Sequence, residues 1–244
     1  MWPSKFGASV ESKPCHRVSN EFLSKKMTAQ PPSYFHAQDA HTAVTPCFTP
    51  GTMIATLRGE RAVETLQQGD KIVTRDNGVQ EIAWIGGRVL GRADMQRAAS
   101  LRPVLLRAGC LGHGLPVRDM LVLPSHRILL MPEHPAALAG ESLIAARDLI
   151  DHREVMAVDT VRVNYIHIMF EHHQIVMSDS IWTESFHAEI KTLRGMDAAQ
   201  RREILSLFPE LETEEGQSAQ ATAARPIVDY ASDIRTDRMM RNII

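Results

Sequence analysis

The sequence predicts an all-β body of many short strands, followed by a helical tail. Between residues 46 and 190, short apolar runs alternate with turn-forming clusters such as Asp76-Asn77-Gly78 and Gly86-Gly87, and few stretches have a helical period. After residue 195 the apolar residues recur at helical spacing instead. Hydrophobic residues make up 44% of the 244 residues, which is enough to fill a core. We therefore expect a sandwich or barrel-like body.

Changes in composition and in the spacing of apolar residues divide the chain into three expected segments. Residues 1–45 contain several prolines, many serines and threonines and no sustained periodicity, which is typical of a flexible leader. Residues 46–190 form the expected β body, and residues 191–244 form a helical C-terminal extension.

Nine apolar runs of the body are expected to form strands, because each is bounded by turn signals. They are residues 53–57, 71–74, 80–85, 104–107, 120–123, 127–131, 154–159, 161–170 and 174–177. Residues 143–150 are expected to hold helical turns instead.

The helix of the extension is expected within Gly195–Leu211. Asp197 can cap its first turn, and Gln200, three residues later, can answer it in a capping box. Four apolar residues then make a stripe that we expect to dock on the body: Ile204, Leu207, Phe208 and Leu211. A polar linker follows, and residues 225–244 can dock again through Ile227, Val228 and Tyr230.

Composition argues against several classes of protein and indicates a cellular compartment. The formal net charge of −2 argues against a nucleic-acid-binding protein, and no apolar run approaches the roughly 20 residues of a membrane helix. The first 30 residues lack the apolar stretch of a signal peptide. Cys15, Cys47 and Cys110 are too few and too scattered for a disulfide framework. We expect a reducing, cytoplasmic setting that keeps the thiols free.

Three blocks hold the residues best suited to chemistry. The first, CFTPGT at residues 47–52, opens with Cys47 and makes a tight turn before an apolar run. The second places His126 between two apolar runs, where an imidazole can act as acid or base at neutral pH. The third runs from Tyr165-Ile166-His167 through the HHQIVMSDS string at residues 172–180 to Glu184-Ser185-Phe186.

In this order the blocks resemble those of the Hint domain, the self-processing module shared by hedgehog proteins and inteins. The third block resembles the closing strand of the short bacterial Hint domains, with His173 at the family's histidine and Asp179 at its turn. The resemblance runs from Pro46 to about Phe186, and residues 102–109 and 114–116 belong to it. It implies a Hint-type β fold for residues 46–190.

The resemblance also implies an activity. Cys47 would attack the peptide bond that precedes it, Pro46–Cys47, and convert the amide into a thioester by an N-to-S acyl shift. His126 would act as the acid or base, with possible support from Thr52, Asp119, His173 and Asp179. The chain's own N-terminal segment would be the substrate, and water or an external nucleophile would resolve the thioester.

Two departures from the family bear on that activity. Leu123 stands three residues before His126, where the family has a threonine or serine whose hydroxyl helps to polarise the scissile peptide. A splicing intein ends in His-Asn followed by Ser, Thr or Cys, whereas this chain has Ser178-Asp179-Ser180. Because a carboxylate does not cyclise readily, the resemblance implies cleavage without full splicing.

Other interpretations remain open from sequence. The chain can be a Hint scaffold kept as a binding or structural module, with its chemistry impaired by Leu123. A thiol protease acting on other proteins would need a substrate pocket, for which the sequence has no signature. No cofactor or metal is expected, because Cys110 and His113 have ligand-like spacing without a second pair to complete a zinc site.

Overall fold

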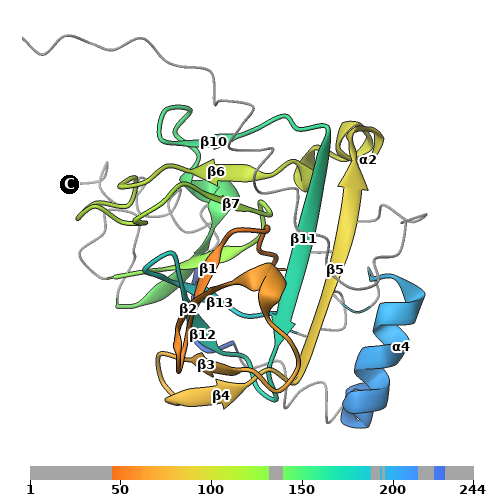
Figure 1. Cartoon of the computed structure of the whole chain (residues 1–244). Coiled ribbons are helices and arrows are strands. Elements are labelled where there is room, and N and C mark those ends of the chain that lie inside the picture. The colour runs from red at the N-terminus through yellow and green to blue at the C-terminus, as the bar shows by residue number, and fades with distance from the viewer. Residues whose placement is uncertain (1–45, 132–139, 188–192, 194–195, 214–222, 229–244) are drawn as a thin grey trace, which may run out of the picture.

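The computed structural model describes residues 46–131, 140–187, 193, 196–213 and 223–228, and it is mostly β, with few helices (Figure 1). The leader expected at residues 1–45 lies outside the described residues. The strands are β1 (Met53–Thr56), β2 (Gly59–Ala62), β3 (Lys71–Val73), β4 (Val79–Glu81), β5 (Trp84–Gly91), β6 (Val104–Leu106), β7 (Met120–Val122), β8 (Arg127–Leu130), β9 (Ser142–Ala145), β10 (Val155–Ala157), β11 (Arg162–Met169), β12 (Ile175–Ser178), β13 (Ile181–Glu184) and β14 (Ile227–Val228). The α-helices are α2 (Arg92–Arg97) and α4 (Ala198–Leu207), and the 3-10 helices are Val63–Thr65, Ala99–Leu101, Ala146–Leu149 and Pro209–Glu212.

Within the described part of the chain, these strands form three hydrogen-bonded groups. The largest has the strand order β14-β9-β8-β13-β12-β1-β3-β4, with β2 paired to β1. A second group has the order β10-β6-β7. The third is the long antiparallel pair of β5 and β11, which lie side by side along the length of the body in Figure 1.

The main core draws on almost every strand. Its fully buried members include Ile54 of β1, Val104 of β6, Ile128 of β8, Ile166 of β11 and Val176 of β12. Strands such as β6, β7 and β8 are buried on both faces and therefore appear in the sequence as short apolar runs, which is why the sequence pattern identified most of the strands. The fold is therefore held by contacts between segments far apart in the chain.

The extension packs on the body as a helix and as a strand. Helix α4 lies beside β5 in Figure 1, and its Ile204, together with Phe208 and Leu211, packs against Trp84 and Phe186. The short strand β14 pairs in parallel with β9. The predicted helical extension thus also contributes an edge strand to the largest sheet.

Two details of the α4 prediction were wrong. Asp197 does cap the helix, because its carboxylate accepts hydrogen bonds from the N–H groups of Ala199 and Gln200. The side chain of Gln200, however, donates to the carbonyl oxygen of Gly87 at 2.8 Å instead of completing a capping box. Leu207 is 43% exposed and takes no part in the docking stripe.

The body also differs from the expected pattern: β2, β13 and α2 lie outside the nine expected runs, and two further differences concern segments for which a structure was expected. Residues 143–150, expected to hold helical turns, begin within strand β9, because Leu143 and Ile144 are fully buried between β8 and β14. The expected turn follows at the 3-10 helix Ala146–Leu149. The single strand expected at residues 80–85 is instead β4 and the start of β5. A short apolar run does not distinguish a buried strand from a buried helical turn, so these places needed tertiary information.

Candidate functional site

Cys47 occupies a short bridging segment between two strands. The N–H of Phe48 donates to the carbonyl oxygen of Ile166 at 2.9 Å, and the N–H of Ile166 donates back to Phe48 at 2.8 Å. Phe48 also makes an antiparallel bridge with Val122, at the end of β7. One position back along this register, Cys47 lies opposite His167 on one side and Leu123 on the other.

Residues directly opposite in antiparallel pairs project their side chains to the same face. Cys47, Leu123 and His167 therefore share one face, and in β5 the residue opposite His167 is Gly86. Two positions along β11, Tyr165 stands opposite Arg88. The strand pairing thus gathers a thiol, an imidazole and a guanidinium from segments separated by up to 120 residues.

The imidazole of His167 contacts both atoms that matter for attack on the Pro46–Cys47 bond. Its Nδ1 lies 3.4 Å from the Sγ of Cys47 and 3.1 Å from the carbonyl oxygen of Pro46, and its Nε2 lies 3.8 Å from the same sulfur. Because a carbonyl oxygen only accepts hydrogen bonds, the contact with Pro46 requires a proton on Nδ1. Nε2 then carries the lone pair.

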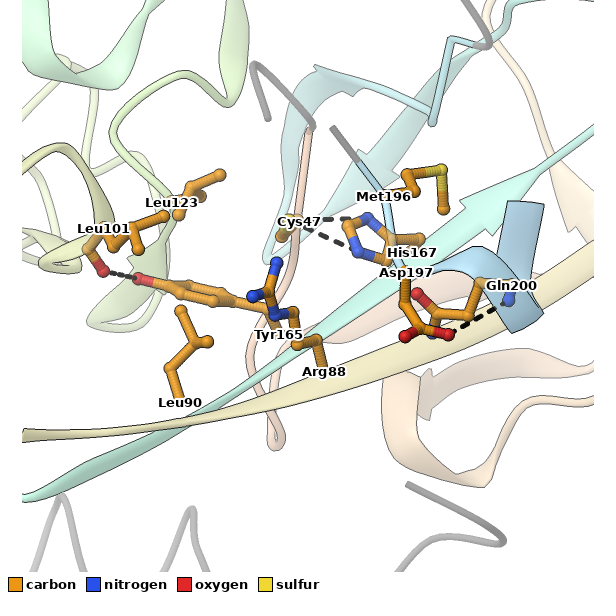
Figure 2. Close-up of a pocket in the computed structure, with 10 residues that line it drawn as sticks. All are labelled: Cys47, Arg88, Leu90, Leu101, Leu123, Tyr165, His167, Met196, Asp197 and Gln200. Carbon is orange, nitrogen blue, oxygen red and sulfur yellow. Dashed lines mark hydrogen bonds between the residues drawn. The ribbon is translucent and has the colours of Figure 1, made fainter. Parts of the chain in front are cut away.

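Burial keeps this pair neutral at neutral pH. It raises the pKa of the Cys47 thiol well above its usual value, although the positive charge of Arg88 acts in the opposite direction. Burial lowers the pKa of His167 to about 4, and the bond to Pro46 only partly offsets this. In Figure 2 the side chain of Arg88 points toward Cys47. The site therefore holds a thiol beside an unprotonated imidazole and a fixed positive charge.

A small pocket of about 30 Å³ opens beside these groups (Figure 2). Cys47 and His167 line it, and Leu90, Leu101 and Leu123 add apolar side chains to the lining. The hydroxyl of Tyr165, another lining residue, donates to the carbonyl oxygen of Leu101 at 2.9 Å. Three further lining residues come from the start of the C-terminal extension: Met196, Asp197 and Gln200.

His126, the predicted acid or base, lies on the other side of Phe48. Its ring is fully buried and meets the Phe48 ring edge-on, with 4.7 Å between the ring centroids. Neither ring nitrogen has a hydrogen-bond partner among the described residues, and burial lowers its pKa to about 3. A buried polar group without a partner is uncommon and calls for a specific explanation.

Thr52 and Asp119 have their described contacts elsewhere. The N–H of Thr52 donates to Thr49 within the turn that follows Cys47, and its buried hydroxyl has no partner among the described residues. The carboxylate of Asp119 accepts from the N–H of Ala108 at 2.9 Å. It makes no hydrogen bond to the His126 ring.

Asp179 and His173 hold strand ends and the C-terminal segment in place. Asp179 accepts from the N–H of Met53 at 3.3 Å and from Arg118 at 3.1 Å. His173 accepts from the N–H of Ala224 at 3.1 Å and stacks on His187 with 4.6 Å between ring centroids. These contacts give both residues a structural role in the described fold.

Comparison with known proteins identifies the family. The sequence model of the Hint domain family matches residues 46–189, more than half of the chain. This chain belongs to the Hint domain family. No curated protein matches it.

Among solved structures, a bacterial intein-like domain from Clostridium thermocellum is similar to this Hint domain. It is 14% identical with a TM-score of 0.35, and the match covers 57% of this chain and 97% of that one. A DnaB intein from Synechocystis is 10% identical with a TM-score of 0.37, over 57% of this chain and 98% of that chain.

The Hint domain brings together a different set of residues from the one expected. Cys47 and His126 flank Phe48, but the imidazole in contact with the Cys47 sulfur is that of His167. His167 was part of the third sequence block, yet its pairing depends on the register of β11 against Phe48. Nothing in the sequence around Arg88 predicted that it belongs to the site, because its position opposite Tyr165 follows only from the β5–β11 pairing.

Two classes of site are absent from the part of the chain that the structure describes. No group of three or more histidine, cysteine, aspartate or glutamate side chains is arranged to hold a metal ion there. In the same residues, no helix is both long and apolar enough to cross a membrane.

Proposed function

We propose that this Hint domain cleaves its own chain between Pro46 and Cys47, by an N-to-S acyl shift with Cys47 as the nucleophile. The observation that supports it most directly is the position of His167, whose ring lies within 3.4 Å of the Cys47 sulfur and 3.1 Å of the Pro46 carbonyl oxygen. A single imidazole can therefore serve the attacking atom and the atom on which negative charge develops.

In the first step, the Cys47 sulfur attacks the carbonyl carbon of Pro46 while its proton passes to Nε2 of His167. Because the pKa of His167 is about 4, its ring is unprotonated at neutral pH and Nε2 has a lone pair to take that proton. The C–O π electrons move onto the Pro46 oxygen, and the Nδ1–H of His167 stabilises the resulting oxyanion. Since the thiol pKa is raised by burial, attack requires this coupled proton transfer rather than a preformed thiolate.

In the second step, the bond between the Pro46 carbon and the Cys47 nitrogen breaks, and the nitrogen gains a proton. We assign this protonation to His126, which lies next to Phe48 and whose ring nitrogens make no hydrogen bond among the described residues. One of its ring nitrogens gives a proton to the Cys47 nitrogen while the other takes the proton that His167 received from the sulfur, so both rings end neutral. The net change is transfer of one proton from sulfur to nitrogen. Pro46 is left as a thioester on Cys47, and the segment before Cys47 is the substrate.

Cleavage then ends when water or an external nucleophile attacks the thioester, without splicing. The position that would need to cyclise is Asp179, whose carboxylate is engaged by the N–H of Met53 and by Arg118. Splicing requires the side-chain amide of an asparagine to cyclise onto its own backbone carbonyl, and the carboxylate of Asp179 does not cyclise readily. We therefore expect no fragment that begins at Ser180.

A second candidate is a Hint scaffold that serves as a binding or structural module. Two observations favour it: the raised pKa of the Cys47 thiol and the apolar side chain of Leu123 beside it. In that case the chain stays intact under all conditions, which separates the two candidates in one measurement.

Intact-mass spectrometry of the purified full chain tests the proposal. We expect a species that begins at Cys47 to accumulate in the wild type and to be missing in Cys47→Ala, because no other side chain there can form the thioester. Cys110→Ala is the matched control and should cleave normally, since Cys110 lies outside the pocket. A wild-type chain that remains full length, or a Cys47→Ala chain that is still cut at this bond, contradicts the proposal.

A further inference from the structure

The pocket beside Cys47 has dimensions that bear on how the thioester is resolved. Building on the proposed self-cleavage, we infer that this pocket is the site of the second substrate, and that the second substrate is water rather than a thiol or amine of larger size. The inference rests on the volume of the pocket, the burial of the reacting groups and the origin of its walls.

The space inside the pocket is small. A cavity needs about 10–15 Å³ of this kind of space to hold one water, and this pocket has about 30 Å³. Roughly two waters therefore fit. A nucleophile with a carbon chain would have to displace Leu123, Leu101 or the residues contributed by the extension.

The reacting groups are also closed to bulk solvent. Cys47 is 2% exposed and His167 is 6% exposed. Close packing of an interior transmits any added volume to its neighbours, so a larger acceptor would meet resistance on several sides at once. The polar groups of the pocket, Arg88 and the His167 ring, provide partners that a bound water needs.

Part of the wall of the pocket comes from outside the segment matched by the family model. Met196 and Gln200 follow residue 189, the last residue of that match. Gln200 is held over the site because its Nε2 donates to the carbonyl oxygen of Gly87 at 2.8 Å. Helix α4 is anchored further along by Ile204 and Phe208, which pack against Trp84 and Phe186. The C-terminal extension thus sets the size of the acceptor.

The chemistry of the step balances with the groups present. The water oxygen bonds to the thioester carbon of Pro46, and a water proton passes to Nε2 of His167. The bond from that carbon to the Cys47 sulfur then breaks, and the sulfur takes the proton back from His167. The products are a free carboxylic acid at Pro46 and the restored thiol of Cys47.

Competition between nucleophiles tests the inference. We expect the wild-type fragment released in oxygen-18 water to carry one heavy oxygen in its new carboxyl group, and dithiothreitol to leave its release rate unchanged. Gln200→Ala removes the bond to Gly87 and should make release respond to dithiothreitol by roughly tenfold or more. Arg202→Ala, at an exposed position of α4, is the control and should behave as the wild type.

A second measurement reads the closure of the pocket without any cleavage. We expect iodoacetamide to modify Cys47 in the folded wild type and in Arg202→Ala at the same slow rate, and in Gln200→Ala roughly tenfold faster or more. Denatured protein, in which every thiol reacts, is the positive control. Equal rates in Gln200→Ala and the wild type would overturn the role given to the extension.

The outcomes separate this inference from the proposed function. Cleavage that dithiothreitol accelerates in the wild type overturns the choice of water and leaves self-cleavage standing. A chain that stays intact in the wild type and in Gln200→Ala overturns self-cleavage, and the assignment of the second substrate falls with it.

Discussion

At the level of single residues, the proposed self-cleavage depends on the His167 imidazole, which contacts the Cys47 sulfur. Its Nδ1 lies 3.1 Å from the Pro46 oxygen, and its Nδ1 and Nε2 lie 3.4 Å and 3.8 Å from the sulfur, so one ring is within reach of both atoms. The fixed positive charge of Arg88 opposes the effect of burial on the thiol pKa. The three groups together make the site more suited to nucleophilic attack than an isolated buried cysteine would be.

We expect His167→Ala to slow release of the N-terminal fragment by about 10²–10⁴-fold, the usual contribution of a general acid–base group. His167→Gln keeps a donor toward Pro46 but does not accept a proton at neutral pH, so it should lose most of this factor as well. The measurement is the rate of fragment release by intact mass. Because the pKa of His167 is about 4, the wild-type rate should also fall as the pH drops through that value. Release from His167→Ala at the wild-type rate would remove His167 from the mechanism.

Leu123 is a second residue whose substitution tests the site. It lines the pocket, and its backbone N–H donates to the carbonyl oxygen of Cys47 at 3.3 Å. Leu123→Thr introduces a hydroxyl at this position. If that hydroxyl bonds the scissile peptide in the transition state, a net contribution of about 0.5–1.5 kcal/mol should speed release roughly 2- to 10-fold.

Leu123→Val is the matched control, because valine has the shape of threonine without the hydroxyl. Both variants should lose about 1–3 kcal/mol of unfolding free energy, measured in urea, as they remove part of a buried side chain. Equal release rates in the two variants would mean that a hydroxyl at position 123 does not reach the scissile peptide.

At the level of elements, strand β5 supports His167 by lacking a side chain opposite it. A Cβ at Gly86 would lie 2.3 Å from the ring of Trp84, which is far inside contact distance. Trp84 in turn stacks near His167, with 6.3 Å between ring centroids. The glycine therefore makes room for two rings on the face that carries the site.

We expect Gly86→Ala to destabilise the protein by about 1–3 kcal/mol, the usual effect of overpacking a core, and to slow fragment release by displacing His167. Thermal and urea unfolding measure the first effect, and intact mass measures the second. Gly91→Ala on the same strand is the control, because a Cβ there would meet only Asp94 at 3.7 Å. It should change stability by less than about 0.5 kcal/mol. A Gly86→Ala variant as stable as Gly91→Ala would contradict this account of the strand.

At the level of the whole molecule, several histidines are buried in a neutral state. Burial lowers the pKa of His126 to about 3, of His167 to about 4 and of His173 to about 3, from an ordinary value of 6.5. As the pH falls below 6.5, the unfolded chain binds protons at these positions before the folded one does. The neutral buried histidines therefore make their full contribution to the free energy of unfolding above the ordinary pKa of 6.5. That contribution is lost as the pH falls toward their pKa values in the folded chain.

We expect the free energy of unfolding to decrease by on the order of 2 kcal/mol per buried histidine between about pH 7 and about pH 5. Urea denaturation at the two pH values measures it. His173→Gln, which removes one such histidine away from the pocket, should reduce the difference by one histidine's share. A wild-type stability that stays level over this range would show that these rings are already protonated or hydrated in the folded chain.

Local sequence was sufficient where the determining interactions are local. The short apolar runs between turn-forming clusters predicted most strands of the body. Asp197 could be predicted as the cap of α4 because a capping side chain bonds to N–H groups only two and three residues away. Cys47 was found because its turn and its place at the start of an apolar run are contiguous in the chain.

Only the tertiary structure decided the partners of those residues. The contact between Cys47 and His167 depends on the register of Phe48 against Ile166, and register follows from the packing of whole strands rather than from the residues that it brings together. Local sequence predicts Gln200 as part of a capping box. Its side chain instead donates a buried hydrogen bond to the carbonyl oxygen of Gly87 on β5, which no local pattern reveals. The proposed nucleophile could therefore be predicted from the sequence, whereas its proposed base and the pocket residues of the extension could be identified only in the folded chain.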